Sequence, residues 1–136
     1  MSNWFKIGLL AIVLITSGCS VGDPRQMAKT DIILEVANSR FYPQKWIIPS
    51  GQKIHLRIIN NSDTQHELVI LNGQSPAESD ATILSNQFWP VSVEQKETDV
   101  TFQAPAMPGE YRLVCSFKDH EKKGEQGVLV VVVPYP

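Results

Sequence analysis

The sequence has few cysteines, no excess of basic residues and no internal repeats. It contains two cysteines in 136 residues, and 12 Lys and Arg residues against 14 Asp and Glu residues give a formal net charge of −2. This balance excludes the strongly basic surface that is typical of nucleic-acid-binding proteins. Charged residues at 19% and aromatic residues at 8% are typical of a soluble globular protein. The length suits one domain of ordinary size.

The N-terminal apolar run, residues 7–15, is too short for a membrane-spanning helix, which needs about 20 apolar residues. Lys6 precedes the run, and the small residues Ser17 and Gly18 follow it, directly before Cys19. A basic start, a short apolar stretch and small residues at the end are the layout of an export signal. The sequence therefore predicts a signal peptide over residues 1–18.

The end of this signal, LITSGCS, resembles the lipobox of bacterial lipoproteins, in which cleavage precedes a cysteine that is then acylated. The resemblance implies lipidation of Cys19 and a periplasmic protein that is anchored to a membrane by its lipid. Thr16 stands where a leucine is usual, and Ser20 would permit transfer to an outer membrane. A spare thiol or one half of a disulfide is the alternative role for Cys19.

The remainder of the chain divides into a tether and a strand-rich domain. Residues 19–30 are polar, contain Gly and Pro and show no periodicity, which is typical of a linker. Residues 31–136 contain short runs of β-branched residues separated by turn residues. In one of these runs Ile54, Leu56 and Ile58 alternate with polar residues, which predicts a strand with one buried face and places His55 on the solvent side.

One segment of this domain has helical signals. Ser75, Pro76 and Glu78 form a capping box with proline at the first helical position. A short helix is therefore expected near residues 76–85. Many short strands with one small helix predict an all-β domain, a Greek-key β-sandwich or barrel.

Three residues that can bind a metal lie near the predicted ends of strands. His66 follows a polar loop, and Cys115 ends a strand five residues before His120. If Cys19 is lipidated, Cys115 is the only thiol left, and a metal bond would protect it in an oxidising compartment. Two imidazoles and a thiolate with a weak fourth ligand form the donor set of a mononuclear copper electron-transfer centre. Each residue also has an ordinary interpretation: a small buried hydrophobe for Cys115, a polar loop residue for His120 and a histidine bonded to backbone for His66.

Three segments resemble the cupredoxins, the small blue-copper proteins. PSGQKIHLRIINNSDTQHELVI is similar to the family's strand, Asn-rich loop and first histidine ligand, and PGEYRLVCSFKDH to its cysteine and second histidine. GEQGVLVV is similar to the closing segment of the family. The resemblance covers residues 31–133. It implies a cupredoxin-like fold and one mononuclear copper ion held by His66, Cys115 and His120.

The closing segment departs from the family at one position. Glu125 stands where many members have the axial methionine, and Met1, Met27 and Met107 lie elsewhere in the sequence. We expect Glu125 to be the fourth ligand, although a solvated loop acid is the alternative. The neighbouring Gln126 should point the opposite way on a strand. A hard, negative carboxylate favours Cu(II) over Cu(I), so the site should have a low reduction potential.

Two functions remain open on the sequence alone. The first is periplasmic electron transfer to an unidentified redox partner protein. The alternative is metal handling without a carrier role, by a copper chaperone or an iron-uptake accessory. An enzyme is not expected, because Asp119 occupies the position of the second cysteine of binuclear copper domains and no oxyanion-type Gly-rich turn accompanies Cys115. Glu67, next to His66, is expected to face solvent or to support the site from outside.

Overall fold

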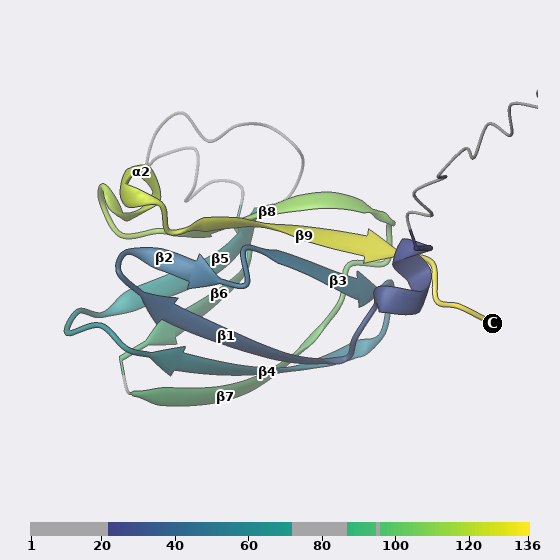
Figure 1. Ribbon diagram of the computed structural model, residues 1–136, viewed down its shortest axis with the longest axis horizontal. Helices are drawn as coiled ribbons and strands as arrows, with labels where there is room; N and C mark the ends of the chain where they lie inside the picture. Colours follow the sequence, from purple (N-terminus) through teal and green to yellow (C-terminus); the bar gives the residue numbers. More distant parts are fainter. Residues whose placement is uncertain (1–21, 72–86, 95) are drawn as a thin grey trace, which may run out of the picture.

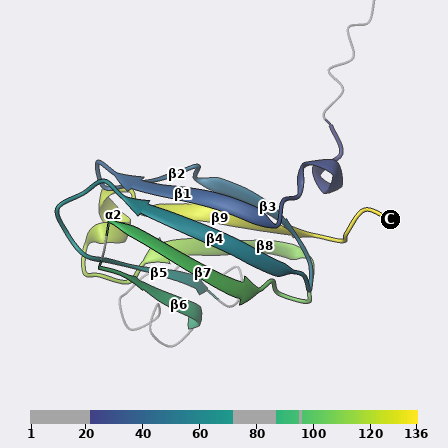
Figure 2. The ribbon, with the colours of Figure 1, turned by 90° about the horizontal axis from the view of Figure 1, so that it is seen from below.

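The computed structural model describes residues 22–71, 87–94 and 96–136. Figure 1 shows these residues forming two β-sheets, with the short helix α2 at one end and the 3-10 helix η1 at the other. Seen from below in Figure 2, the sheets are stacked as two layers. The strand orders are β2-β1-β4-β7 in the first sheet and β3-β9-β8-β5-β6 in the second. The elements are η1 (Pro24–Met27), β1 (Asp31–Ala37), β2 (Arg40–Tyr42), β3 (Lys45–Pro49), β4 (Lys53–Asn60), β5 (His66–Leu71), β6 (Gln87–Val93), β7 (Glu97–Gln103), β8 (Gly109–Cys115), α2 (His120–Lys123) and β9 (Gln126–Val132).

Alternation of apolar and polar residues explains why these segments form half-buried strands. In β4 the side chains of Ile54, Leu56 and Ile58 are buried, while His55 is exposed as predicted. Side chains of successive residues point to opposite faces of a strand, so one face of β4 packs between the sheets. The largest buried side chains of this core include Trp46, Phe41, Leu34 and Leu129.

Neighbouring strands in each sheet are often not consecutive in sequence, so the chain makes crossover connections. β1 runs parallel to β4, and β3 runs parallel to β9. The chain changes sheet after β2, β3, β4, β6 and β7, so each sheet contains strands from both halves of the sequence. The prediction of an all-β sandwich is confirmed.

The short helix lies at a different place from the one predicted from the sequence. The expected helix at residues 76–85 lies outside the described residues. The helix that the structure describes, α2, follows β8, where the sequence predicts a loop. η1 lies within the predicted tether. Among the described residues, no helix is long and apolar enough to cross a membrane.

The arrangement of strand ends determines where the candidate ligands meet. β4 ends at Asn60, β5 begins at His66, β8 ends at Cys115 and β9 begins at Gln126. The connections between these strands lie at the same end of the sandwich as α2, opposite η1 and the C-terminus (Figure 1). His66 is thereby brought to the same end of the molecule as Cys115 and His120, which are distant from it in sequence.

Candidate metal centre

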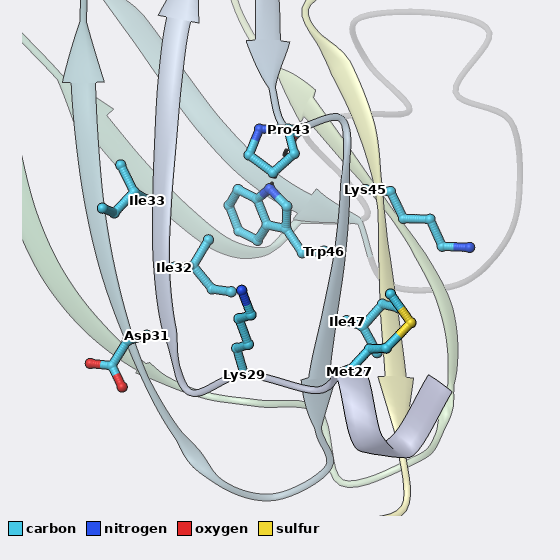
Figure 3. Close-up of a pocket in the computed structure, with 9 residues that line it drawn as sticks. All are labelled: Met27, Lys29, Asp31, Ile32, Ile33, Pro43, Lys45, Trp46 and Ile47. Atoms are coloured by element: carbon cyan, nitrogen blue, oxygen red, sulfur yellow. Dashed lines mark hydrogen bonds between the residues drawn. The ribbon is translucent and has the colours of Figure 1, made fainter. Parts of the chain in front are cut away.

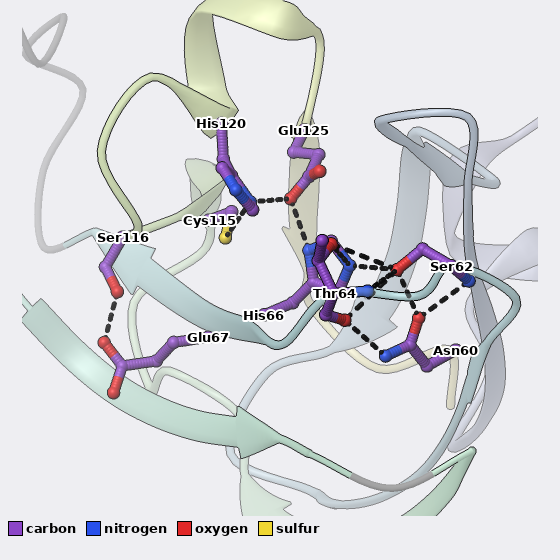
Figure 4. A network of polar contacts seen from close by, with 9 residues as sticks. All are labelled: Asn60, Ser62, Thr64, His66, Glu67, Cys115, Ser116, His120 and Glu125. Carbon is purple, nitrogen blue, oxygen red and sulfur yellow. Dashed lines mark hydrogen bonds and ion pairs between the residues drawn. The ribbon is translucent and has the colours of Figure 1, made fainter.

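His66 is the first residue of β5 and is held by the loop before it. Its Nε2 atom lies 2.6 Å from the hydroxyl of Ser62 and 3.3 Å from that of Thr64. The Ser62 hydroxyl also donates to the side-chain carbonyl of Asn60 at 2.7 Å, so its oxygen can accept a hydrogen bond from the Nε2–H of His66. The other ring nitrogen, Nδ1, faces the Glu125 carboxylate, as Figure 4 shows.

The Asn60 side chain stabilises this loop from within. Its Nδ2 donates to the carbonyl of Thr64 at 2.9 Å, and its Oδ1 accepts from the backbone N–H of Ser62 at 2.9 Å. Asn60 and His66 are both buried. The roles of Asn60, Ser62 and Thr64 in positioning His66 were not predicted from the sequence. A turn-forming segment with Asn, Ser and Thr shortly before a histidine at a strand start is a detectable signal, because these side chains bond to nearby backbone in turns.

Cys115 is the last residue of β8 and is fully buried. It pairs with Leu68 across the sheet, and its backbone N–H donates to the carbonyl of Glu125 at 3.0 Å. Burial raises the pKa of the thiol to about 12, although the backbone N–H groups of Glu67 and Phe117 partly oppose this by bonding to the sulfur. In the metal-free protein the sulfur therefore carries its proton at neutral pH.

His120 begins α2, and its ring points back toward the sulfur. Its Nδ1 lies 3.5 Å from the Cys115 Sγ. The turn before it contains Asp119 at a φ of 64°, and α2 ends at Gly124 with a φ of 118°. A left-handed φ favours glycine, and a Cβ at Gly124 would lie 3.2 Å from the Ser39 carbonyl oxygen. An ion pair between Glu121 and Arg112 joins α2 to β8.

Glu125 is buried and lies between the two histidines. Its Oε2 is 2.7 Å from Nδ1 of His66 and 3.0 Å from Nδ1 of His120. Burial alone would raise the pKa of Glu125, but hydrogen bonds from His66 and Cys115, together with the charges of both imidazoles, hold it below its usual value. The carboxylate is therefore ionised at neutral pH. Gln126, next in sequence, is exposed on the other side of the strand, as predicted.

The position of Glu125 depends on a close contact two residues later. A Cβ at Gly127 would lie 2.5 Å from the carbonyl oxygen of Gln44, so a side chain there would force the two segments apart. The same carbonyl accepts from the backbone N–H of Val128 at 2.7 Å. This contact fixes the start of β9 against the chain before β3.

The four predicted site residues are brought together. One donor atom from each of His66, Cys115, His120 and Glu125 lies within 4.8 Å of all the others. Two imidazole nitrogens and a sulfur with one further donor form the ligand set of a single type 1 copper ion. Glu125 is only 1% exposed, which does not fit the alternative of a solvated loop acid.

A separate groove lies away from these donors, near η1. It has a volume of about 410 Å³ and is lined by Met27, Ile32, Trp46 and Ile47, with Lys29 and Lys45 also on its walls. Figure 3 shows it beside β1 and β3, where the two sheets separate. None of its lining residues belongs to the metal centre.

The raised pKa of Cys115 predicts how the metal-free protein responds to alkali. A thiol that ionises only at about 12 in the folded state, against an ordinary value of 9.0, keeps a proton that the unfolded chain has lost. Stability should therefore fall as pH rises from about 9 to about 12, by at most about 1.4 kcal/mol per pH unit. Urea unfolding of the metal-free protein should show this decline, and Cys115→Ala should flatten it. Equal slopes for the two proteins would contradict the prediction.

Comparison with known proteins supports the same fold. The family model of the cupredoxin-like domain matches residues 7–131, whereas no curated protein sequence matches the chain. Auracyanin from Roseiflexus castenholzii, in its dithionite-reduced form, is 25% identical with a TM-score of 0.67, over 77% of this chain and 98% of its own. Auracyanin A from Chloroflexus aurantiacus, a "blue" copper protein, is 25% identical with a TM-score of 0.62, over 75% and 98%.

A more distant structure shares the fold alone. Reduced rusticyanin is 16% identical with a TM-score of 0.56, over 77% of this chain and 81% of its own. The resemblance inferred from three sequence segments is thus confirmed by a match over most of the chain and by the arrangement of the strands. This chain belongs to the cupredoxin-like domain family.

Proposed function

We propose that the protein is an electron-transfer protein with one copper ion bound by His66, Cys115, His120 and Glu125. The observation that carries this proposal is the convergence of their four donor atoms within 4.8 Å at one end of the sandwich. Copper, when bound, would supply a couple between Cu(II) and Cu(I) that exchanges one electron at a time. The blue-copper description of auracyanin A, a structural neighbour, supports this assignment.

The burial of the donors favours a carrier over an enzyme. His66, Cys115 and Glu125 are buried, so water and substrates have little access to the metal position. Only His120 has an exposed edge, with 19% of its side chain accessible. A metal that is enclosed in this way exchanges electrons through a ligand more readily than it binds a substrate.

The surface at His120 is the proposed docking site for the redox partner protein. Phe117 is 40% exposed and packs edge-on against the His120 ring, with 5.7 Å between ring centroids. Lys118, Lys122 and Lys123, which lie close to His120 in sequence, are also exposed. An apolar contact within a charged rim increases the encounter rate with a partner of opposite charge.

We further propose that the protein works in the periplasm, attached to a membrane by a lipid on Cys19. The layout of residues 1–18 and the lipobox-like LITSGCS support this location. η1 and the N-terminal side of the described chain lie at the end opposite the metal centre (Figure 1). A lipid attached on that side would leave the His120 surface accessible to partners.

Voltammetry tests the electron-transfer function. The copper-loaded protein should give a reversible one-electron wave and keep its copper content over repeated cycles, because the donors are already arranged around the metal position. The measurement is cyclic voltammetry with metal analysis before and after cycling. Loss of copper on reduction would contradict the carrier function.

Glu125 supports a second candidate function, metal handling. A buried carboxylate is a hard donor that suits Cu(II) or iron better than Cu(I), so reduction would weaken the site and release the ion. A copper chaperone or iron-uptake accessory would use this release. Transfer of copper to an acceptor protein upon reduction, at a rate faster than spontaneous loss, would favour this function over the carrier.

A further inference from the structure

A carboxylate outside the metal position joins the two ligand segments. Glu67 follows His66, and Ser116 follows Cys115. Because β5 and β8 are antiparallel with Leu68 opposite Cys115, Glu67 lies opposite Ser116. The backbone N–H of Ser116 donates to the Glu67 carbonyl at 3.0 Å, and its hydroxyl donates to the Glu67 carboxylate (Figure 4).

Glu67 also contacts the sulfur ligand directly through its backbone. Its N–H bonds to the Cys115 sulfur and opposes the rise in the pKa of that thiol. Glu67, the neighbour of His66, therefore bonds both to Cys115 and to Ser116, the neighbour of Cys115. A change in the separation of β5 and β8 at this end would break all three contacts.

Within residues 22–71, 87–94 and 96–136, no ion pair neutralises the charge of Glu67. The side chains of Glu67 and Ser116 are partly buried, so solvent screens the carboxylate less than it would at an exposed position. Glu67 and Glu125 therefore place two negative charges near the metal position, on separate strands.

We propose that Glu67 is a positioning residue of the metal centre, whose carboxylate holds His66 and Cys115 in register and whose charge lowers the reduction potential of bound copper. The inference rests on the proposed function, because it concerns the copper ion of that site. Negative charge near the ion favours Cu(II) over Cu(I). Groups that hold ligands from outside typically change metal affinity by about 10–100-fold when they are removed.

Three substitutions separate the two roles of Glu67. Glu67→Gln keeps an acceptor for the Ser116 hydroxyl but removes the charge. Ser116→Ala removes the hydrogen bond and keeps the charge, and Glu67→Ala removes both. The matched control is Glu110→Gln, which removes an exposed carboxylate from the start of β8, at the other end of the strand that carries Cys115.

The experiment measures the reduction potential, the rate of Cu(II) release to a chelator and the melting temperature of each metal-free protein. Glu67→Gln should raise the potential more than Glu110→Gln does and leave the release rate within about 2-fold. Glu67→Ala and Ser116→Ala should release copper about 10-fold faster or more. A bond with only a structural role would lower the melting temperatures and leave the potential unchanged.

The outcomes distinguish this inference from the proposed function. Copper uptake by the wild-type protein, and its loss in Cys115→Ser, test the proposed function first, and failure there overturns both. If copper binds normally but Glu67→Gln has the potential of the control, the electrostatic role is wrong. If Glu67→Ala and Ser116→Ala release copper at the wild-type rate, the positioning role is wrong.

Discussion

Copper binding should be lost almost completely in Cys115→Ser. Among the four described residues of the site, Cys115 supplies the sulfur donor, and an alcohol does not replace a thiolate as a soft ligand. We expect the affinity for copper to fall by more than about 100-fold, since loss of outer contacts alone costs about 10–100-fold. The intense absorption from sulfur-to-copper charge transfer should disappear. Copper titration followed by absorption spectroscopy measures both effects.

The other cysteine provides the control for this experiment. Cys19→Ser should retain the absorption band and the copper stoichiometry, because Cys19 is predicted to carry a lipid and not a metal. Retention of the band in Cys115→Ser would show that another residue supplies the donor. Equal loss in both variants would point to a metal shared between the cysteines, which the proposed site does not allow.

A large rise in reduction potential is expected for Glu125→Gln. The carboxylate lies 2.7 Å and 3.0 Å from Nδ1 of the two histidines, so it borders the position that a metal would take. Removal of this buried charge destabilises Cu(II), and the Coulomb energy of a unit charge at short range corresponds to a rise on the order of 100 mV. With the carboxylate present the spectrum should be greener or redder than that of a blue site. Glu125→Gln should shift the spectrum toward blue.

Gln126→Ala is the matched control, because Gln126 is adjacent in sequence but exposed. Its potential and spectrum should be those of the wild-type protein. Coordination by the carboxylate would be excluded by a wild-type spectrum with one intense blue band that Glu125→Gln leaves unchanged.

The sequence predicts the sandwich and three of the converging residues because both depend on local patterns. Alternating apolar residues identify strands such as β4, and the five-residue spacing of Cys115 and His120 places both on one connection. The prediction of Glu125 as a ligand depends on the resemblance to the cupredoxins, since an acid on a loop carries no signal of burial by itself.

The remaining features depend on contacts between distant segments. α2 has four residues, which is too short for helical periodicity to be detected. The contact of Glu67 with Ser116 follows from the register of β5 against β8, which no local pattern of residues specifies. The signals at residues 76–85 are strong locally, but the described residues do not include them.

The hydrogen bond from the Cys115 N–H to the Glu125 carbonyl, at 3.0 Å, closes the chain between these two residues into a ring. Three donors of the site belong to this ring, and only His66 comes from outside it. The spacing of the donors is therefore fixed by the number of residues in the ring. Insertion of a single residue between His120 and Glu125 would change which metals fit, while the two sheets below kept their packing.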